Sequence, residues 1–369
     1  MSLISFNNEQ KLIEGEIRKF SKTELEPIAD EIDKKAIFPI EIIKKLSDLG
    51  LSSLIIPEVY GGAGLDTTSL CVVLEELSKT CASISTILLV NNCLVAFPVM
   101  KFAPEKIKEY YLRKLTKGEI GACSTELGID LPGESISIRD TDGKLMISGE
   151  QHFVLNGEAA HFVVLPISVS TGKALYILDN NPRIEQKKHH ILGLRAAGIV
   201  GYQFRDLDIE ADTCLLDGQE AVDALMQIRH YTHIGFSAIS LGIAEAAYEA
   251  SIKYSKERKQ FGRAICEFPM VQEMLIDMKT RIEATRLLVY NAAAEYDKGD
   301  TNTLSAHIAR LQSGEAAVYA GIKAVQVYGG YGYIKEYPVE RFLRDAKAIQ
   351  VLCETPNELR ALIAKGILL

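Results

Sequence analysis

Two consecutive glycines, Gly329 and Gly330, interrupt a helical pattern in the stretch KAVQVYGGYGYIKEYPVERFLRDAK, which spans 323–347. A glycine pair between two helices lets the backbone approach a flat or anionic ligand, because no Cβ stands in the way. The pair is therefore compatible with a ligand-binding turn, and the residues around it decide. The alternative is a helix C-cap followed by a turn, which is the commoner origin of such a pair.

Charge and cysteine usage narrow the classes of ligand. The net charge is −8 and no basic tract stands out, which argues against nucleic-acid binding. Placed arginines and helix N-termini can still hold an anionic cofactor. The seven cysteines form no CxxC pair, which argues against a zinc or iron–sulfur site and for reduced thiols. The N-terminal segment MSLISFNNEQKLIEGE is unlike a signal or transit peptide. We therefore expect a cytoplasmic protein without a metal.

The elements that position this turn fall into three regions. Helical periodicity covers 1–117, short β-type runs separated by turn signals fill 118–217, and helical patterns return over 218–369. We predict an α+β fold with an N-terminal α-helical domain, a middle antiparallel β-barrel domain and a C-terminal four-helix-bundle domain, divided at these boundaries.

One apolar run, over 84–100, is long enough to raise the question of a membrane span. Asn91, Asn92 and Pro98 interrupt it, so we interpret it as a buried helix and expect no membrane association. The chain has neither a P-loop nor a strand–GxGxxG–helix motif, which excludes a Rossmann nucleotide site.

Three stretches together resemble the acyl-CoA dehydrogenase family. They are YSKERKQFGRAICEFPMVQEMLIDM, QVYGGYGYIKEYPVERFLRDAK and the strand-to-turn segment ending FVLNG. Their order and spacing, with the α–β–α organisation, extend the resemblance from end to end. It implies an FAD enzyme, usually a homotetramer, that removes an α proton and a β hydride from an acyl thioester. Its electrons would normally pass to an electron-transferring flavoprotein.

The resemblance also implies which residues hold the adenosine diphosphate half of FAD. Arg258 and Phe261 match family positions at the pyrophosphate and adenine, across a dimer interface. A planar guanidinium suits phosphate, although an arginine at a helix C-terminus is also favoured by the helix dipole alone. Gln272 matches a family glutamine near the cofactor. Gln326–Gly330 match the QxxGG segment that receives the adenosine side of FAD from the partner subunit.

At the flavin ring the resemblance is less complete. Ser124 and Thr125 match the loop that contacts the pyrimidine ring, and Phe153 can pack on the isoalloxazine. Leu155 replaces the threonine whose hydroxyl normally bonds to flavin N5, so only a backbone N–H could do so here. The next loop reads LGIDLPG where the family usually reads PGAGSD, which puts a serine contact to the ligand phosphates in doubt.

The catalytic base is where this chain departs most from the family pattern. Members usually read YEGTNEIQR after RDA, and the glutamate takes the α proton; this chain reads VLCETPNELR. Without a gap, Cys353 falls on that glutamate and Thr355 on the threonine. With a one-residue shift, Glu354 takes the base position. A carboxylate desolvated by substrate suits the role better than a buried thiol, so we predict Glu354 as the base and Thr355 as a cofactor contact. The geometry favours the ungapped alignment, because Pro356 fixes the turn.

The segment RHYTH, over 229–233, occupies the family's thioester-ligand region. We predict Thr232 and His233 as substrate contacts, against the simpler reading that a single histidine in a helix is structural. Members whose base lies on this helix carry glutamate where Thr232 stands, so Thr232 excludes that variant.

Three further functions compete with straight-chain acyl-CoA dehydrogenation. The displaced base suits a family member that acts on a cyclic or already activated acyl-CoA, or on an acyl carrier protein thioester. The same features suit a flavin-binding scaffold subunit without turnover. The third is an oxidase that uses dioxygen, although the chain lacks the extra C-terminal domain of the larger acyl-CoA oxidases.

Overall fold

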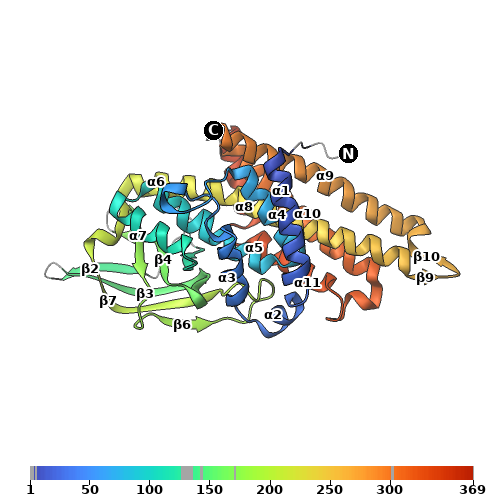
Figure 1. The fold of residues 1–369 in the computed structure, drawn as a ribbon, viewed down its shortest axis with the longest axis horizontal. Helices are drawn as coiled ribbons and strands as arrows, with labels where there is room; N and C mark the ends of the chain where they lie inside the picture. The colour runs from blue at the N-terminus through green and yellow to red at the C-terminus, as the bar shows by residue number, and fades with distance from the viewer. Residues whose placement is uncertain are drawn as a thin grey trace.

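The computed structural model describes residue 4 and residues 6–125, 136–141, 144–169, 172–300 and 303–368. Helices come first along the chain, then a sheet, then long helices that run from the sheet to the opposite end of the molecule (Figure 1). The N-terminal helices are α1 (Asn8–Phe20), α2 (Ala29–Lys35), α3 (Ile40–Asp48), α4 (Thr67–Thr80), α5 (Ala82–Leu89), α6 (Phe97–Phe102) and α7 (Glu105–Thr116).

Helix α4 begins with its backbone N–H groups capped from two directions. The Asp66 carboxylate accepts a hydrogen bond from Ser69 N at 2.7 Å. The Asp297 carboxylate, far along the chain, accepts from Thr67 N at 2.8 Å and from Thr68 N at 3.0 Å. Carboxylates at this end of a helix satisfy free N–H groups and complement the helix dipole. The cap therefore fixes the first helical layer to the C-terminal helices.

The apolar segment Ala82–Phe102 is long and apolar enough to cross a membrane, but 94% of its most apolar window is buried inside the fold. The prediction of a buried helix is confirmed. Seven residues of π-helix, Val90–Ala96, separate α5 from α6. Asn91 lies in this π-helix and accepts a hydrogen bond from Gly121 N at 3.1 Å, which ties the segment to the first strand of the sheet.

The middle region is one sheet whose central strands are buried. Its order is β6-β7-β3-β1-β4-β5-β8, with β2 paired to β3. The β1–β4 pair is parallel and the other pairs are antiparallel. The strands are β1 (Gly121–Ser124), β2 (Ser137–Thr141), β3 (Lys144–Leu155), β4 (Phe162–Val169), β5 (Gly172–Asp179), β6 (Glu185–Lys188), β7 (Val200–Ile209) and β8 (Cys214–Asp217).

The predicted β-barrel is wrong. Among the residues described, the two end strands β6 and β8 do not pair with each other, so the sheet stays open. Each end strand has only four residues, and every residue of β6 is exposed. Such short edge strands offer too few backbone groups to close a barrel. The domain boundaries at 117/118 and 217/218 stay predictions.

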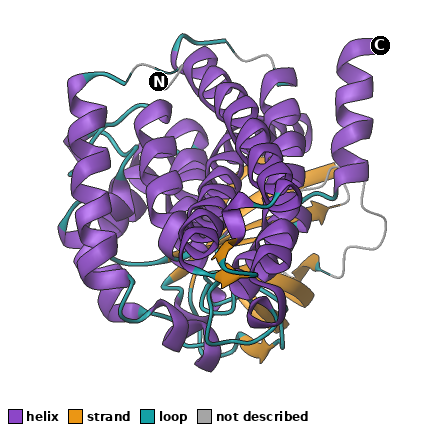
Figure 2. Ribbon diagram, turned by 90° about the vertical axis from the view of Figure 1, so that its right-hand side faces the viewer, coloured by secondary structure: helices purple, strands orange, loops and turns teal. Residues whose placement is uncertain are grey.

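The C-terminal helices are long and closely packed (Figure 2). Helix α10 packs against α8, α9 and α11, and α4 packs against α8. A two-stranded hairpin joins α8 to α9 at the end of the molecule farthest from the sheet (Figure 1). The elements are α8 (Gly218–Glu257), β9 (Lys259–Gln260), β10 (Arg263–Ala264), α9 (Pro269–Asp297), α10 (Leu304–Tyr328), α11 (Val339–Val351) and α12 (Pro356–Leu368).

Candidate active site

Glu354 lies in a tight turn between α11 and α12. Cys353 has a φ of 66°, a left-handed conformation that is rare outside glycine and reverses the chain direction here. Arg310, from α10, donates hydrogen bonds to the carbonyl oxygens of Ile349 and Leu352, the latter at 3.2 Å, and so holds the end of α11. Thr355 N donates to the Glu358 carboxylate at 2.6 Å and begins α12. The turn is therefore fixed on both sides.

The side chain of Glu354 points into a polar cluster between α8 and α10. Only 5% of the residue is exposed. Its Oε2 lies 2.8 Å from His233 Nε2, and His233 Nδ1 lies 2.9 Å from His307 Nδ1. Its Oε1 lies 3.8 Å from Arg229 Nε and has no hydrogen-bond partner. Two helices and the turn thus build one buried cluster around a single carboxylate.

The charges of this cluster follow from burial and pairing. Burial raises the pKa of Glu354, but His233, followed by Arg229 and Arg310, outweighs burial and lowers that pKa below its ordinary value. Burial lowers the pKa of His233 despite the neighbouring carboxylate. Burial also raises the pKa of the Cys353 thiol well above its ordinary value. At neutral pH the site therefore holds an ionised Glu354, a neutral His233 and a protonated Cys353.

This arrangement leaves Oε1 of Glu354 without a hydrogen bond, with Arg229 Nε 3.8 Å away. Buried carboxylate oxygens are normally hydrogen-bonded, because leaving one unpaired costs free energy. Oε2 is satisfied by His233, and Oε1 is not satisfied. An ionised carboxylate oxygen is chemically able to act as a proton acceptor.

The two predicted substrate residues have different surroundings. Thr232 is buried, and its hydroxyl donates to Ile228 O in its own helix at 2.7 Å, so the helix already uses that donor. His233 is fully buried and contacts Glu354 instead of facing an open cavity. His233 therefore contacts the predicted base, whereas the Thr232 hydroxyl is hydrogen-bonded to the backbone of its own helix.

A second region gathers the residues predicted to hold the adenosine half of FAD. A pocket of about 600 Å³ lies where the end of α8 meets the end of α10. A Cβ on Gly329 or Gly330 would meet no atom within 4 Å, so the glycine pair leaves open space, and the Arg258 guanidinium lies 5.6 Å from the Tyr331 ring. This open, partly aromatic and cationic surface fits a flat anionic group such as FAD. The lining residues are Tyr254, Arg258, Gln260, Ile265, Val327, Tyr328, Gly329, Gly330, Tyr331 and Ile334.

Three of the residues predicted to hold the adenosine half of FAD lie outside this lining. Phe261, at the turn of the β9–β10 hairpin, is 93% exposed. Gln272 donates from its side chain to Cys266 O at 3.0 Å. Gln326 is exposed on α10, just before the glycine pair. All three residues are exposed on the single chain.

The residues predicted near the flavin ring meet at the ends of β1 and β3. Thr125 N donates to Phe153 O at 3.0 Å, and the Thr125 hydroxyl donates to the same oxygen at 3.3 Å. The side chain of Ser124 is fully buried, whereas Phe153 is 44% exposed and can present its ring to a ligand. The loop LGIDLPG, expected to differ in its ligand contacts, lies outside the described residues.

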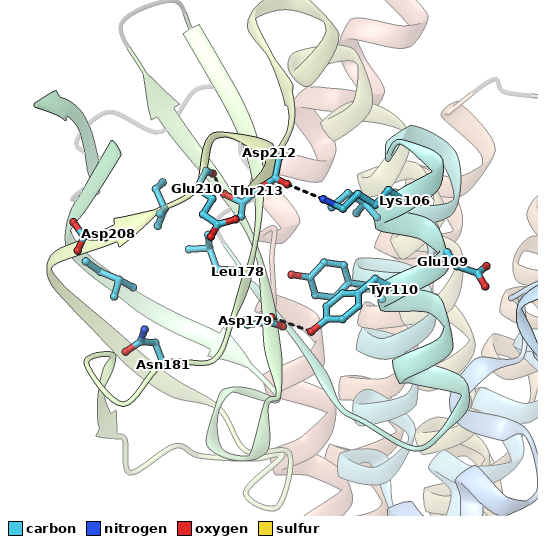
Figure 3. A pocket seen from close by; sticks show the side chains of 14 residues that line it. Lys106, Glu109, Tyr110, Leu178, Asp179, Asn181, Asp208, Glu210, Asp212 and Thr213 are labelled. Carbon is cyan, nitrogen blue, oxygen red and sulfur yellow. Dashed lines mark hydrogen bonds and ion pairs between the residues drawn. The ribbon is translucent and has the colours of Figure 1, made fainter. Parts of the chain in front are cut away.

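A further pocket of about 660 Å³ lies between α7 and the sheet (Figure 3). The Tyr110 hydroxyl donates to Asp179 at 3.3 Å across it, and Lys106 pairs with Asp212 at 3.4 Å. None of the residues predicted for catalysis or cofactor binding lines this pocket. Across the described ranges, no group of three or more His, Cys, Asp or Glu side chains is arranged to hold a metal ion.

Sequence reasoning missed two residues of the Glu354 cluster, His307 and Arg310. Both lie in α10 within LSAHIARLQSGEAA, and both are buried. A histidine and an arginine three residues apart lie on the same face of a helix. The stretch is otherwise rich in small residues. The pair of His307 and Arg310 could therefore have indicated a buried polar site.

Comparison with known proteins agrees with this geometry. The family descriptions "Acyl-CoA dehydrogenase, N-terminal domain" and "Acyl-CoA dehydrogenase, C-terminal domain" match residues 7–119 and 222–368. An acyl-CoA dehydrogenase of Bacillus subtilis is 35% identical over 372 residues, which cover 98% of each chain. A short-chain specific acyl-CoA dehydrogenase of Clostridium acetobutylicum is 34% identical over 378 residues, again 98% of each chain.

A solved structure supports the same assignment. Butyryl-CoA dehydrogenase from Megasphaera elsdenii is 31% identical, with a TM-score of 0.94 over 99% of this chain and 100% of that one. Its similarity covers the helices and the sheet alike. The chain therefore belongs to the acyl-CoA dehydrogenase family.

Proposed function

We propose that Glu354 is the base of an FAD-dependent acyl-CoA dehydrogenation, in which the Cα–Cβ bond of an acyl thioester is desaturated. The observation that carries the proposal is the unpaired Oε1 of this buried carboxylate. The adjacent Cys353 is the rival for the role, and its thiol stays protonated because burial raises its pKa. A protonated thiol cannot take the α proton, whereas an ionised carboxylate can.

In the proposed reaction Glu354 Oε1 takes the α proton, and the electron pair of that C–H bond forms the new double bond. Bound FAD would accept the hydride from the β carbon. Arg258 and the Gly329-Gly330 backbone would hold the adenosine diphosphate portion. Thr125 and Phe153 would hold the flavin ring. The buried position of Glu354 excludes water, which strengthens its interaction with the substrate.

Substrate, partners and location are part of the same proposal. The substrate is an acyl-CoA, and the electrons pass to an electron-transferring flavoprotein. The protein is a cytoplasmic homo-oligomer, most simply a tetramer, in which Phe261, Gln272 and Gln326 meet FAD across a subunit interface. The exposure of Phe261 fits this arrangement, because a second subunit would cover an apolar ring that is 93% exposed on the single chain.

One observation favours a second candidate. The His233 hydrogen bond holds Glu354 toward the interior of the helical bundle and lowers its pKa, which weakens it as a base. A weak base suits a substrate whose α proton is already acidified, such as a cyclic or otherwise activated acyl-CoA or an acyl carrier protein thioester. The scaffold alternative, without turnover, is the outcome if no thioester reduces the flavin.

The test is anaerobic stopped-flow reduction of the purified flavoprotein by a straight-chain acyl-CoA, followed by flavin absorbance. Glu354→Gln should slow flavin reduction by about 100-fold or more, because it removes the proton acceptor. The matched control is Cys353→Ala at the neighbouring position, which should reduce at close to the wild-type rate. The opposite pattern would move the base to Cys353. Reduction of wild type by activated thioesters only would favour the second candidate.

A further inference from the structure

The hydrogen bonds around Glu354 continue beyond His233, and nothing in the proposed reaction uses the continuation. Glu354 Oε2, His233 and His307 form a chain, with contacts of 2.8 Å and 2.9 Å. His233 is fully buried and His307 is 6% exposed. The two imidazole rings are 5.0 Å apart between centroids and meet edge to face. The three side chains come from α8, α10 and the turn after α11, so the packing of these elements holds the hydrogen-bonded chain together.

The protonation states of the two histidines allow one assignment of donors and acceptors along these hydrogen bonds. Burial lowers the pKa of His233, and it lowers that of His307 to about 3, so both rings are neutral at neutral pH. Next to an ionised carboxylate, His233 Nε2 must carry its proton and donate it to Glu354. His233 Nδ1 is then a lone pair, so His307 Nδ1 must carry the other proton and donate to His233.

We propose that His307 and His233 are positioning residues that hold Oε2 of Glu354 and leave Oε1 as the oxygen that takes the substrate proton. The inference rests on the proposed role of Glu354. His307 acts only through His233, because its contact is with that ring and not with the carboxylate. The pair therefore selects which of two chemically equivalent oxygens reacts.

The hydrogen-bonded chain also changes the pKa of Glu354. An imidazole that accepts a hydrogen bond at Nδ1 becomes a stronger donor at Nε2, since hydrogen bonds in a chain polarise one another. The stronger donor stabilises the ionised carboxylate and lowers its pKa. Loss of the His307 donor should therefore make Glu354 more basic and allow its side chain to turn.

The other charged and titratable groups near the chain set its background. Arg229 and Arg310 both favour ionised Glu354, and the His230 ring adds to the lowered pKa of His307. These groups stay unchanged in the comparison below. By element they are Arg229 and His230 on α8, Arg310 on α10, and Cys353 in the turn after α11.

The experiment compares two substitutions at His307 in the flavin-containing protein. His307→Asn places an amide nitrogen near the position of Nδ1 and keeps a donor to His233, whereas His307→Leu removes it. The rate constant of anaerobic flavin reduction by a straight-chain acyl-CoA is measured against pH. In His307→Leu we expect the acid limb of the profile to move to higher pH by about half a unit, because the carboxylate loses a polarised donor. In His307→Asn the limb should stay at the wild-type position.

The rate of flavin reduction is also measured in Glu354→Gln. This variant tests the role of Glu354 as base separately from the positioning role of the two histidines. If Glu354→Gln reduces as fast as wild type, the base assignment fails. If Glu354→Gln is slow but the acid limb is the same in His307→Leu as in wild type, only the positioning role is overturned. Equal shifts in His307→Leu and His307→Asn would also overturn the positioning role, because the shift would then not depend on a hydrogen-bond donor to His233. Flavin content and the circular dichroism spectrum, compared between variants, identify any that do not fold.

Discussion

Two buried glutamates differ in how their carboxylate oxygens are paired. Both oxygens of Glu75 have partners: Arg286 donates to one, and the Tyr290 hydroxyl donates to the other at 2.7 Å. Glu354 has a hydrogen bond on one oxygen only, and its other oxygen lies 3.8 Å from Arg229 Nε. A fully paired carboxylate gains nothing from accepting a proton, whereas a half-paired one keeps a site for it.

The buried histidines predict a loss of stability in acid. Burial, with a smaller effect from His233, lowers the pKa of His230 from its ordinary value near 6.5 to about 4. Between those values the unfolded chain binds a proton that the native protein does not. The stabilisation is therefore complete above about pH 6.5 and is lost as the pH falls toward 4.

Urea unfolding of wild type and His230→Gln at about pH 7 and about pH 5 measures this contribution. The free energy of unfolding should fall less in the variant than in wild type, because glutamine does not titrate. An equal fall in both proteins would show that other groups cause the acid sensitivity. The comparison within each protein cancels any loss of packing around the Tyr296 ring, which meets His230 edge to face.

Among the elements, α4 and α8 approach unusually closely. A Cβ on Gly242 of α8 would lie 2.3 Å from Glu75 O and 2.0 Å from Ser78 Oγ, both on α4. Glycine at this crossing is therefore required by the approach of a neighbouring backbone. The contact joins the first helical layer to the C-terminal bundle.

Gly242→Ala should lower the free energy of unfolding by about 1–3 kcal/mol, because one of the helices must move. Gly15→Ala is the matched control in α1, where the added Cβ would meet nothing within 4 Å. That change should raise the free energy of unfolding by about 0.5–1 kcal/mol through helix propensity. Urea denaturation of both variants checks the pair, and equal effects would contradict the close-contact argument.

The long elements could be predicted from the sequence, and the short ones could not. Helical patterns over 1–117 and 218–369 predicted the regions that α1–α7 and α8–α12 occupy, because most of these helices bury apolar side chains along their length. The strands β6 and β8 carry too few residues for an alternating pattern to stand out. The π-helical residues 90–96 also gave no signal, since they depend on what Asn91 contacts outside its own helix.

Part of the candidate site could likewise be predicted from the sequence, and part could not. Glu354 and His233 came from a resemblance in local motifs. Their contact did not, because Glu354 and His233 lie 121 residues apart along the chain and meet only in the folded protein. Local patterns identify side chains with suitable chemistry, and only the tertiary packing decides which of them meet.

At the scale of the whole molecule, one end is left with exposed rings. Phe261 and Gly262 both have positive φ, at 50° and 84°, which forms a tight turn between β9 and β10. A phenylalanine in this conformation is strained, and strain of this kind collects at binding surfaces. Tyr333 is also exposed, at 87%. The end farthest from the sheet thus exposes apolar surface, where we propose that a second subunit packs.

Phe261→Asp should weaken the proposed homo-oligomer by about tenfold or more, because buried aromatic residues carry much of the binding free energy at interfaces. Sedimentation velocity over a concentration series, together with flavin content, measures the effect. The control is Val59→Asp, an apolar residue at 70% exposure in the N-terminal region. An unchanged assembly in Phe261→Asp would place the subunit contact elsewhere.

The cap that Asp297 places on α4 has a consequence for the newly made chain. Its partner Thr67 emerges from the ribosome 230 residues earlier. At roughly 5–20 residues per second, α4 exists for about 10–50 s before its second cap has been synthesised. During that interval the apolar faces of the first helices have no C-terminal bundle to cover them. Nascent chains that stall before residue 297 should therefore be the ones that chaperones bind.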